Sequence, residues 1–211
     1  MMQKEINNDS LVNSLITQEV LKSKTLIESF RKIDRKDFVL LDEEDTYTID
    51  KNLKIGYSQT LSQPLVVAFM LEMLDLKDAH KVLDIGSGSA YTTALISQAV
   101  GKIGYVFGLE TIPALVSFGK ENLKKYEIYN AFISKASFDL GIKRKKFDRI
   151  LVSASASKMP VDLLDQLEEN GKMVIPINKS IYLIEKKEGK YFENRVADFD
   201  FEPLIMNWDN L

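Results

Sequence analysis

Cysteine is absent from this chain of 211 residues, and histidine occurs once, as His80. Without thiols the chain can form no disulfide, zinc–thiolate site, iron–sulfur cluster or cysteine nucleophile. A metal site built from several histidines is excluded as well, and we expect no bound metal. His80 precedes the first strand of the predicted main sheet, whereas ligands of such sheets bind beyond the carboxyl ends of the strands. We therefore expect His80 in a surface loop away from the chemistry.

Long apolar runs and an excess of positive charge are also missing. No apolar stretch reaches the roughly 18 residues of a membrane-spanning helix, and residues 1–10 lack the apolar core and cleavage site of a signal peptide. The formal net charge is −3, from 28 Lys and Arg against 31 Asp and Glu. Broad nucleic-acid binding rests on phosphate neutralisation, so this balance disfavours it. The expected protein is cytoplasmic, with no membrane and no nucleic acid as partner.

The length and the hydrophobic content of 45% are those of one globular domain spanning residues 1–211. Apolar residues recur near helical spacing over residues 10–33, which predicts a helix there. Residues 34–62 contain turn formers and few periodic runs, so we expect an irregular segment. Together these segments predict an N-terminal cap over residues 1–62, resting on a core over residues 63–211.

From Pro64 onward, apolar strands alternate with amphipathic helices. This alternation predicts an α/β fold with a doubly wound, mostly parallel sheet. The chain ends with two strand patterns joined near Gly189, which predicts an antiparallel ending. The expected strands are residues 81–85, 105–109, 131–134, 148–153, 172–177, 180–187 and 190–199, and the expected helices are residues 64–75, 89–100, 113–125 and 160–169.

The most informative stretch is the glycine-containing turn after the first core strand. Residues 82–85 are apolar apart from Asp84, and Gly86-Ser87-Gly88 follows before the next helix. Such a turn lets the backbone approach a ligand closely and places the ligand at a helix N-terminus. Glu110 ends the next strand, at the offset that places an acid on a ribose in such sheets. A turn without a ligand is the alternative, and Tyr91 in place of a third glycine disfavours a dinucleotide site.

The acid, the two spaced glycines and the small residue over positions 84–90 resemble the first motif of class I S-adenosylmethionine-dependent methyltransferases. Residues 55–64, Ile-Gly-Tyr-Ser-Gln-Thr-Leu-Ser-Gln-Pro, resemble the Gly-x-x-Gln-Thr-Ile-Ser-x-Pro segment of the protein-L-isoaspartate O-methyltransferase family. The resemblance covers residues 10–205 and implies a Rossmann-like methyltransferase sheet with an antiparallel C-terminal strand and an N-terminal helical cap. Further motifs follow in the family's order at residues 109–113, 147–150, 152–160, 164–167, 171–176 and 201–204.

Carried over position by position, the resemblance implies S-adenosylmethionine as cofactor and Ser62 as the active-site serine. The alternative for Ser62 is a helix N-cap, because it precedes Pro64 by two residues; the two roles are compatible. The implied cofactor-binding residues are Gln59, Thr60 and Leu61 beside Ser62, Asp84, Gly86, Ser87 and Gly88 on the methionine side, Glu110 on the ribose, and Thr111, Ile112, Ala136 and Ser137 at the adenine.

Two departures from the family pattern bear on recognition. The family carries Gly-Asp-Gly after the third strand, with the Asp reading the adenine amino group; this chain has Lys135-Ala136-Ser137. Either backbone groups near Ala136 and Ser137 replace that carboxylate, or the cofactor binds more weakly than is usual for the family. Glu202 stands where the family has an apolar residue in the tail that shapes the peptide groove, so substrate choice is affected too.

The resemblance implies methyl transfer to the carboxylate of isoaspartyl residues in damaged proteins or peptides, which leads through a succinimide back to some normal aspartate. A carboxylate is ionised at neutral pH and needs no general base, so the enzyme has to align and desolvate the reacting groups. Ser62 would donate a hydrogen bond. The alternatives are a sibling enzyme acting on ordinary Asp or Glu carboxylates of a specific peptide, and a non-catalytic cofactor-binding module. We expect a monomer.

Overall fold

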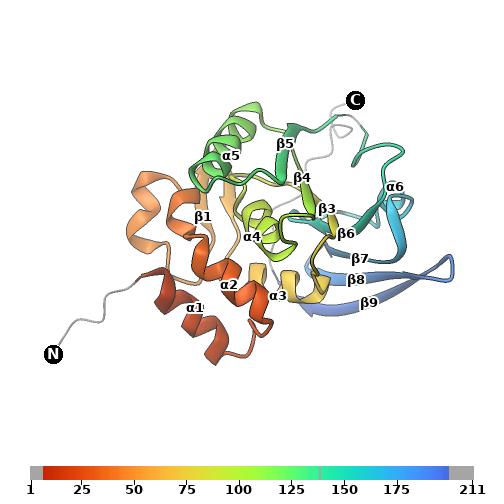
Figure 1. Cartoon of the computed structure of the whole chain (residues 1–211), viewed down its shortest axis with the longest axis horizontal. Helices are drawn as coiled ribbons and strands as arrows, with labels where there is room; N and C mark the ends of the chain where they lie inside the picture. Colours follow the sequence, from red (N-terminus) through yellow and green to blue (C-terminus); the bar gives the residue numbers. More distant parts are fainter. Residues whose placement is uncertain (1–6, 138, 200–211) are drawn as a thin grey trace.

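The computed structural model describes residues 7–137 and 139–199 (Figure 1). Its main sheet has the strand order β5-β4-β3-β6-β7-β8-β9 within the described residues. The pairs from β5 to β7 are parallel, and β8 and β9 add antiparallel strands. This confirms the mostly parallel α/β sheet with an antiparallel ending. The strands are β3 (Lys81–Ile85), β4 (Tyr105–Glu110), β5 (Ala131–Lys135), β6 (Phe147–Val152), β7 (Leu167–Ile177), β8 (Ser180–Lys187) and β9 (Lys190–Asp198).

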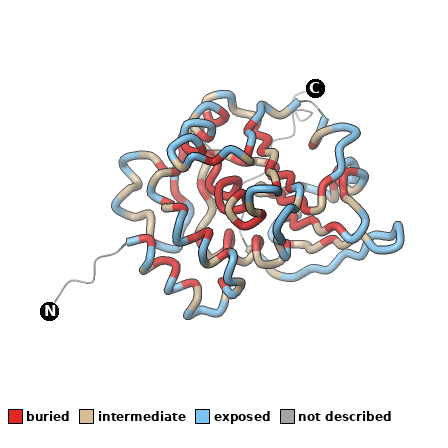
Figure 2. The backbone as a smooth tube through the Cα atoms, viewed as in Figure 1, coloured by how far each residue is buried: buried red, intermediate tan, exposed pale blue. Residues whose placement is uncertain are grey.

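Alternate residues of the strands build two apolar layers, one on each face of the sheet. Val82, Leu151 and Val174 face a large cluster that includes the helices from α1 to α5, whereas their neighbours Leu83 and Ile150 face a smaller one. Figure 2 shows the buried residues gathered along the strands and the inner sides of these helices. The helices concerned are α1 (Asn8–Thr17), α2 (Lys24–Lys32), α3 (Pro64–Leu74), α4 (Tyr91–Ala99) and α5 (Pro113–Lys125).

The second face of the sheet carries little helix. Its cover consists of α6 (Val161–Leu164) and of loop residues such as Ala136, Leu140 and Ile142. The predicted helix over residues 160–169 is therefore too long. It ends early because the Gln166 side chain turns back to bond Leu140, Ile142 and Asp162, and because Leu167 already pairs with Phe147 of β6.

The predicted helix over residues 10–33 is wrong in one respect: it is two helices. Glu19 takes a positive φ of 56°, which ends α1. The carboxylate of Glu72 on α3 then accepts the backbone N–H groups of Lys22 and Ser23 at 2.7 and 2.8 Å and the Ser23 hydroxyl at 3.0 Å. A tertiary contact thus supplies hydrogen bonds at the start of α2, which apolar spacing cannot reveal.

Residues 34–62 are more ordered than the sequence suggests. They form two 3₁₀ turns, η1 (Arg35–Phe38) and η2 (Leu41–Thr46), and a hairpin of β1 (Leu53–Gly56) and β2 (Gln59–Leu61). Tyr57 and Ser58 join the strands with φ values of 56° and 58°. Two-residue turns of that conformation favour Asn and Gly, so Tyr-Ser gives no sequence signal for a hairpin.

The remaining sequence predictions concern single positions. His80 lies in the loop before β3, as predicted, and its Nδ1 accepts the backbone N–H of Lys77 at 3.1 Å. The segment 201–204 and its Glu202 lie outside the described residues. Across residues 7–137 and 139–199, no helix combines the length and the apolarity needed to cross a membrane.

A buried carboxylate connects the carboxyl ends of the central strands. Asp84 of β3 has no exposed surface. Its Oδ2 accepts the hydroxyls of Thr92 and Thr93 at 2.8 and 2.6 Å, and its Oδ1 accepts the Ser153 hydroxyl at 3.2 Å. Burial raises the pKa of Asp84 above its ordinary value, and the three hydroxyl donors oppose that rise. Asp84 thereby fixes the first turn of α4 and the residue after β6 on one strand end.

Thr93→Val should lower the free energy of unfolding by about 1.5–3 kcal/mol, because it removes a hydroxyl donor to a buried charged group without changing side-chain shape. The lost donor stabilised the ionised form, so the variant's Asp84 pKa rises further. The loss of unfolding free energy is therefore complete above the Asp84 pKa of the variant. It shrinks as the pH falls and Asp84 becomes protonated. Denaturant unfolding at several pH values measures it.

Ser97→Ala is the matched control, since the Ser97 hydroxyl on the same helix donates to the neutral carbonyl of Ala94. This variant should lose about 0.5–1.5 kcal/mol of unfolding free energy, and the loss should not depend on pH in that way. If the loss of unfolding free energy depended on pH equally in both variants, the stabilising role assigned to the ionised Asp84 would be contradicted.

Candidate active site

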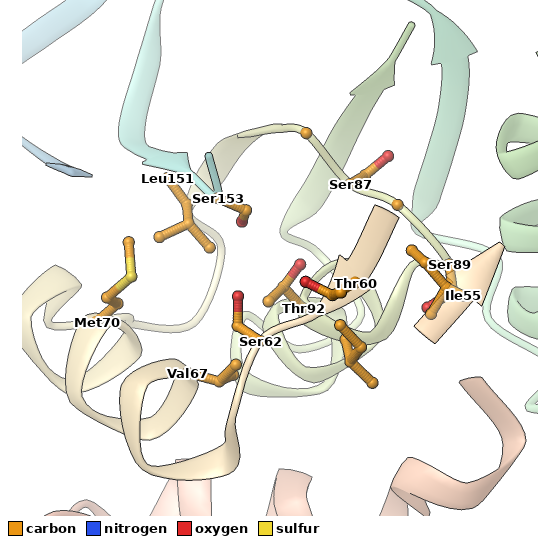
Figure 3. Close-up of a pocket in the computed structure, with 13 residues that line it drawn as sticks. Ile55, Thr60, Ser62, Val67, Met70, Ser87, Ser89, Thr92, Leu151 and Ser153 are labelled. Carbon is orange, nitrogen blue, oxygen red and sulfur yellow. The ribbon is translucent and has the colours of Figure 1, made fainter. Parts of the chain in front are cut away.

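A pocket lies between the β1–β2 hairpin with the start of α3 on one side and the loop after β3 on the other. Figure 3 shows the side chains of Thr60, Ser62 and Thr92 directed into the same space, with Leu151 and Ser153 across from Ser62. The pocket lies at the carboxyl ends of β3 and β6, where α/β sheets bind ligands. Its lining residues are Ile55, Thr60, Leu61, Ser62, Val67, Met70, Gly86, Ser87, Gly88, Ser89, Thr92, Leu151 and Ser153.

Ser62 sits in the short link between β2 and α3. The N-cap residue of α3 is Gln63, and its side chain makes no capping bond, so the alternative in which Ser62 caps the helix does not hold. Residues 47–52, here called the cap loop, bond the start of α3 instead, because Asn52 Oδ1 accepts the Gln63 N–H at 2.9 Å and Asp50 Oδ1 accepts the Leu65 N–H at 2.8 Å. The Ser62 side chain is thus left to face the pocket.

The loop after β3 has the backbone shape that two glycines permit. Gly86 and Gly88 take φ values of 78° and 52°, a region that residues with a Cβ rarely adopt. A Cβ on Gly88 would come within 3.0 Å of the Ile55 side chain on the hairpin. The loop and the hairpin therefore meet directly, and the glycine leaves the pocket open.

Glu110 lies at the end of β4 with 6% of its surface exposed. Its Oε2 accepts the Gly88 N–H at 2.9 Å, and its Oε1 accepts the Ile112 N–H at 2.9 Å and the Thr111 hydroxyl at 3.2 Å. A carboxylate offers about four acceptor positions, so these three donors hold it rigidly and leave one position, on Oε2, for a ligand hydroxyl. Its attachment to Gly88 places it at the edge of the glycine loop.

Ala136 and Ser137 follow β5 at the same edge of the sheet. The Ala136 N–H donates to the Glu110 carbonyl at 2.8 Å, and the Ser137 hydroxyl donates to the Asp139 carbonyl at 3.2 Å. Ile112 is partly buried against the large apolar cluster. The residues predicted to border an adenine ring thus surround Glu110, and the Ala136 side chain supplies no hydrogen-bond acceptor.

The structure brings most of the predicted residues together. Thr60, Leu61 and Ser62 share the pocket with the glycine loop, and Glu110 connects that loop to residues 111–112 and 136. Gln59 is less involved, because its side chain donates to the Ser58 carbonyl at 3.3 Å in the hairpin turn. Asp84 lies beneath the pocket with its carboxylate occupied by hydroxyls.

Sequence reasoning missed several lining residues. Ser153 directly follows a core strand, so the strand-end position could have revealed it. The others lie on the hairpin, on α3 and α4, on β6 and in the loop before α4, and only the tertiary structure orients them toward the pocket: Ile55, Val67, Met70, Ser89, Thr92 and Leu151.

Comparison with known proteins identifies the family of the chain. The model of the protein-L-isoaspartate(D-aspartate) O-methyltransferase family matches residues 6–208. Protein-L-isoaspartate O-methyltransferases from Methanopyrus kandleri and Fervidobacterium nodosum are 38% and 36% identical over 206 and 187 residues, which cover 93% and 86% of this chain and 90% and 94% of theirs.

A solved Plasmodium falciparum chain assigned to the same enzymes, in complex with S-adenosyl-L-homocysteine, has 31% identity and a TM-score of 0.85, covering 95% of this chain and 99% of that one. These matches confirm the resemblance inferred from the motifs and the predicted enzyme class. The chain belongs to the protein-L-isoaspartate(D-aspartate) O-methyltransferase family.

Proposed function

We propose that this chain transfers a methyl group from S-adenosylmethionine to the carboxylate of isoaspartyl residues in damaged proteins or peptides. The observation that carries the proposal is the single continuous site made by Ser62, the glycine loop and Glu110 in a chain of this family. Each of these parts lies at the carboxyl edge of the sheet, and each contacts or faces the next.

The residues of the site fit the cofactor. Gly88 keeps the space beside Ile55 free of a side chain, and the free acceptor position on the fixed Glu110 carboxylate suits a ribose hydroxyl. Thr60 and Ser62 face the methionine side across from Leu151 and Ser153. Ile112, Ala136 and Ser137 border the adenine. Asp84 contributes by holding the first turn of α4 to Ser153 after β6.

When bound, S-adenosylmethionine supplies a methyl group on a sulfonium sulfur. The acceptor carboxylate has a pKa of about 4 and is already ionised at neutral pH, so the chain needs no general base. The hydroxyl of Ser62 donates a hydrogen bond that orients the reacting group in a pocket with apolar walls. Positioning of this kind accounts for large rate effects, and it uses no cysteine and leaves His80 outside the site.

The proposal extends to the location, the oligomeric state and the partners of the enzyme. We place the enzyme in the cytoplasm as a monomer acting on peptides and proteins, without a nucleic-acid partner. The net charge of −3 supports the last point.

Three peptides that differ at one residue test the substrate assignment. The isoaspartyl peptide should accept a labelled methyl group, whereas the matched aspartyl and asparaginyl peptides should not. Transfer to the aspartyl peptide instead would establish the sibling enzyme, which the sequence departures at Ala136 and Glu202 favour. Transfer to neither, with the cofactor product bound, would establish a non-catalytic binding module.

Ser62→Ala should lower turnover at least tenfold while the affinity for S-adenosyl-L-homocysteine changes little, because the hydroxyl orients the reacting group and does not cap α3. Steady-state kinetics and calorimetric titration of the same preparation separate the two effects. Ser117→Ala is the control, since its exposed hydroxyl donates to the Pro113 carbonyl on α5. A fully active Ser62→Ala enzyme would remove Ser62 from the catalytic residues.

Ala136→Asp should tighten S-adenosyl-L-homocysteine binding about tenfold or more, because a hydrogen bond to a charged group contributes about 1.5–3 kcal/mol. The new carboxylate would accept the adenine amino group, which the wild-type methyl group cannot. Calorimetry with the corresponding inosine analogue, which lacks that amino group, gives the control. Equal changes for both ligands would show that position 136 does not read the adenine.

A further inference from the structure

Arg35 in η1 is a completely buried cation whose nearest acidic neighbours, Asp50 and Glu43, act on it only from beyond ion-pair distance. Its exposed fraction is 0%, and within the described residues no acidic oxygen lies at ion-pair distance from it. Its guanidinium instead donates to four backbone carbonyls: Tyr47 at 2.6 Å, Ile49 at 3.4 Å, Lys51 at 2.8 Å and Ser62 at 3.2 Å. Burying a charge that has no ion-pair partner costs folding free energy, so packing alone does not explain why an arginine occupies this position.

The four carbonyls belong to two segments, and the bonds from Arg35 fix the position of one segment relative to the other. Three are in the loop 47–51, and the fourth is the carbonyl of Ser62 itself. The same loop holds the next residues through Asn52 on the Gln63 N–H and Asp50 on the Leu65 N–H. Arg35 therefore anchors the Ser62 backbone on one side, and the loop that Arg35 organises anchors it on the other.

The element that carries Arg35 also contacts the opposite wall of the site. Phe38 of η1 packs against Tyr91, the first residue of α4, with 5.4 Å between ring centroids, and Phe30 meets the same ring edge-on at 6.2 Å. Tyr91 directly follows the glycine loop and Ala90. One short turn thus sets the distance between Ser62 and the loop expected to hold the cofactor.

We propose that Arg35 is a positioning residue for the methyl transfer: through the Ser62 carbonyl and the loop 47–51 it places the Ser62 hydroxyl relative to the glycine loop. This inference rests on the proposed function. Burial lowers the pKa of Arg35 to about 10, so the group stays charged at neutral pH. The two terminal nitrogens of the planar guanidinium bond four carbonyls at once, whereas a lysine ammonium has three donors on one nitrogen and cannot bond all four.

Arg35→Lys tests the proposal against a matched control in the same protein. Arg149 is also a buried arginine that donates to backbone carbonyls, those of Leu74 and Asp75 at the far end of α3 and that of Asp148. Arg149→Lys should therefore cost comparable stability without touching Ser62. The measurements are kcat and KM with the isoaspartyl peptide at a temperature where both variants are folded, the dissociation constant for S-adenosyl-L-homocysteine, and thermal unfolding.

The expected result is a fall in kcat of tenfold or more for Arg35→Lys, with KM and the dissociation constant changed less than threefold, and kcat within twofold of wild type for Arg149→Lys. Equal loss of kcat in both variants, or no loss in Arg35→Lys, would overturn the proposal. If the wild-type protein itself transfers no methyl group to the isoaspartyl peptide, the proposed function is wrong, and that failure is distinct from a failure of the role proposed for Arg35.

Should Arg35→Lys fail to fold, Asn52→Ala carries the test, because it removes the acceptor of the Gln63 N–H at an exposed position. It should lower kcat several-fold at unchanged affinity for S-adenosyl-L-homocysteine. Wild-type kcat in that variant would contradict the positioning of Ser62 by the cap loop.

Discussion

The site depends on two buried carboxylates at neighbouring strand ends, each bonded by groups of the loop that follows β3 or of the helix after it. Asp84 accepts three hydroxyls and fixes the first turn of α4 beside the residue after β6. Glu110 accepts the Gly88 N–H and so holds the same loop from β4. Carboxylates of this kind are stable in an apolar interior only when hydrogen bonds satisfy them. The glycine loop is therefore preorganised before any ligand binds.

The N-terminal segment completes the site from the other side. Its hairpin brings Ile55, Thr60 and Ser62 over the glycine loop, and Arg35 and the loop 47–51 hold that segment against α3. Different interactions fix the two sides of the site. Buried carboxylates that accept hydrogen bonds fix the sheet side, and a buried arginine that donates to backbone carbonyls fixes the N-terminal side. For a methyl transfer that requires alignment rather than a base, both halves contribute by limiting motion.

The sequence predicts the sheet well because the parallel strands are nearly continuous apolar runs that end in turn residues. It also locates Ser62, the glycine loop and Glu110, since each lies at a strand end or in a family motif. The same reasoning fails where a distant side chain decides the local structure. Glu72 separates the first two helices, Gln166 ends α6 early, and Asp50 and Asn52 take over the capping considered for Ser62. Arg35 acts across the fold on loop 47–51 and on Ser62, so its neighbours in the chain give no sign of its partners.

The most direct test of the account is a crystal structure of the protein with S-adenosyl-L-homocysteine. We expect a ribose hydroxyl on the Glu110 carboxylate, the sulfur on the side of the pocket that Ser62 faces, and the adenine beside Ile112 and Ala136 without a side-chain acceptor for its amino group. Asp84 should keep its three hydroxyl donors and touch no ligand atom. A ribose bound away from Glu110, or a sulfur turned away from Ser62, would contradict the account.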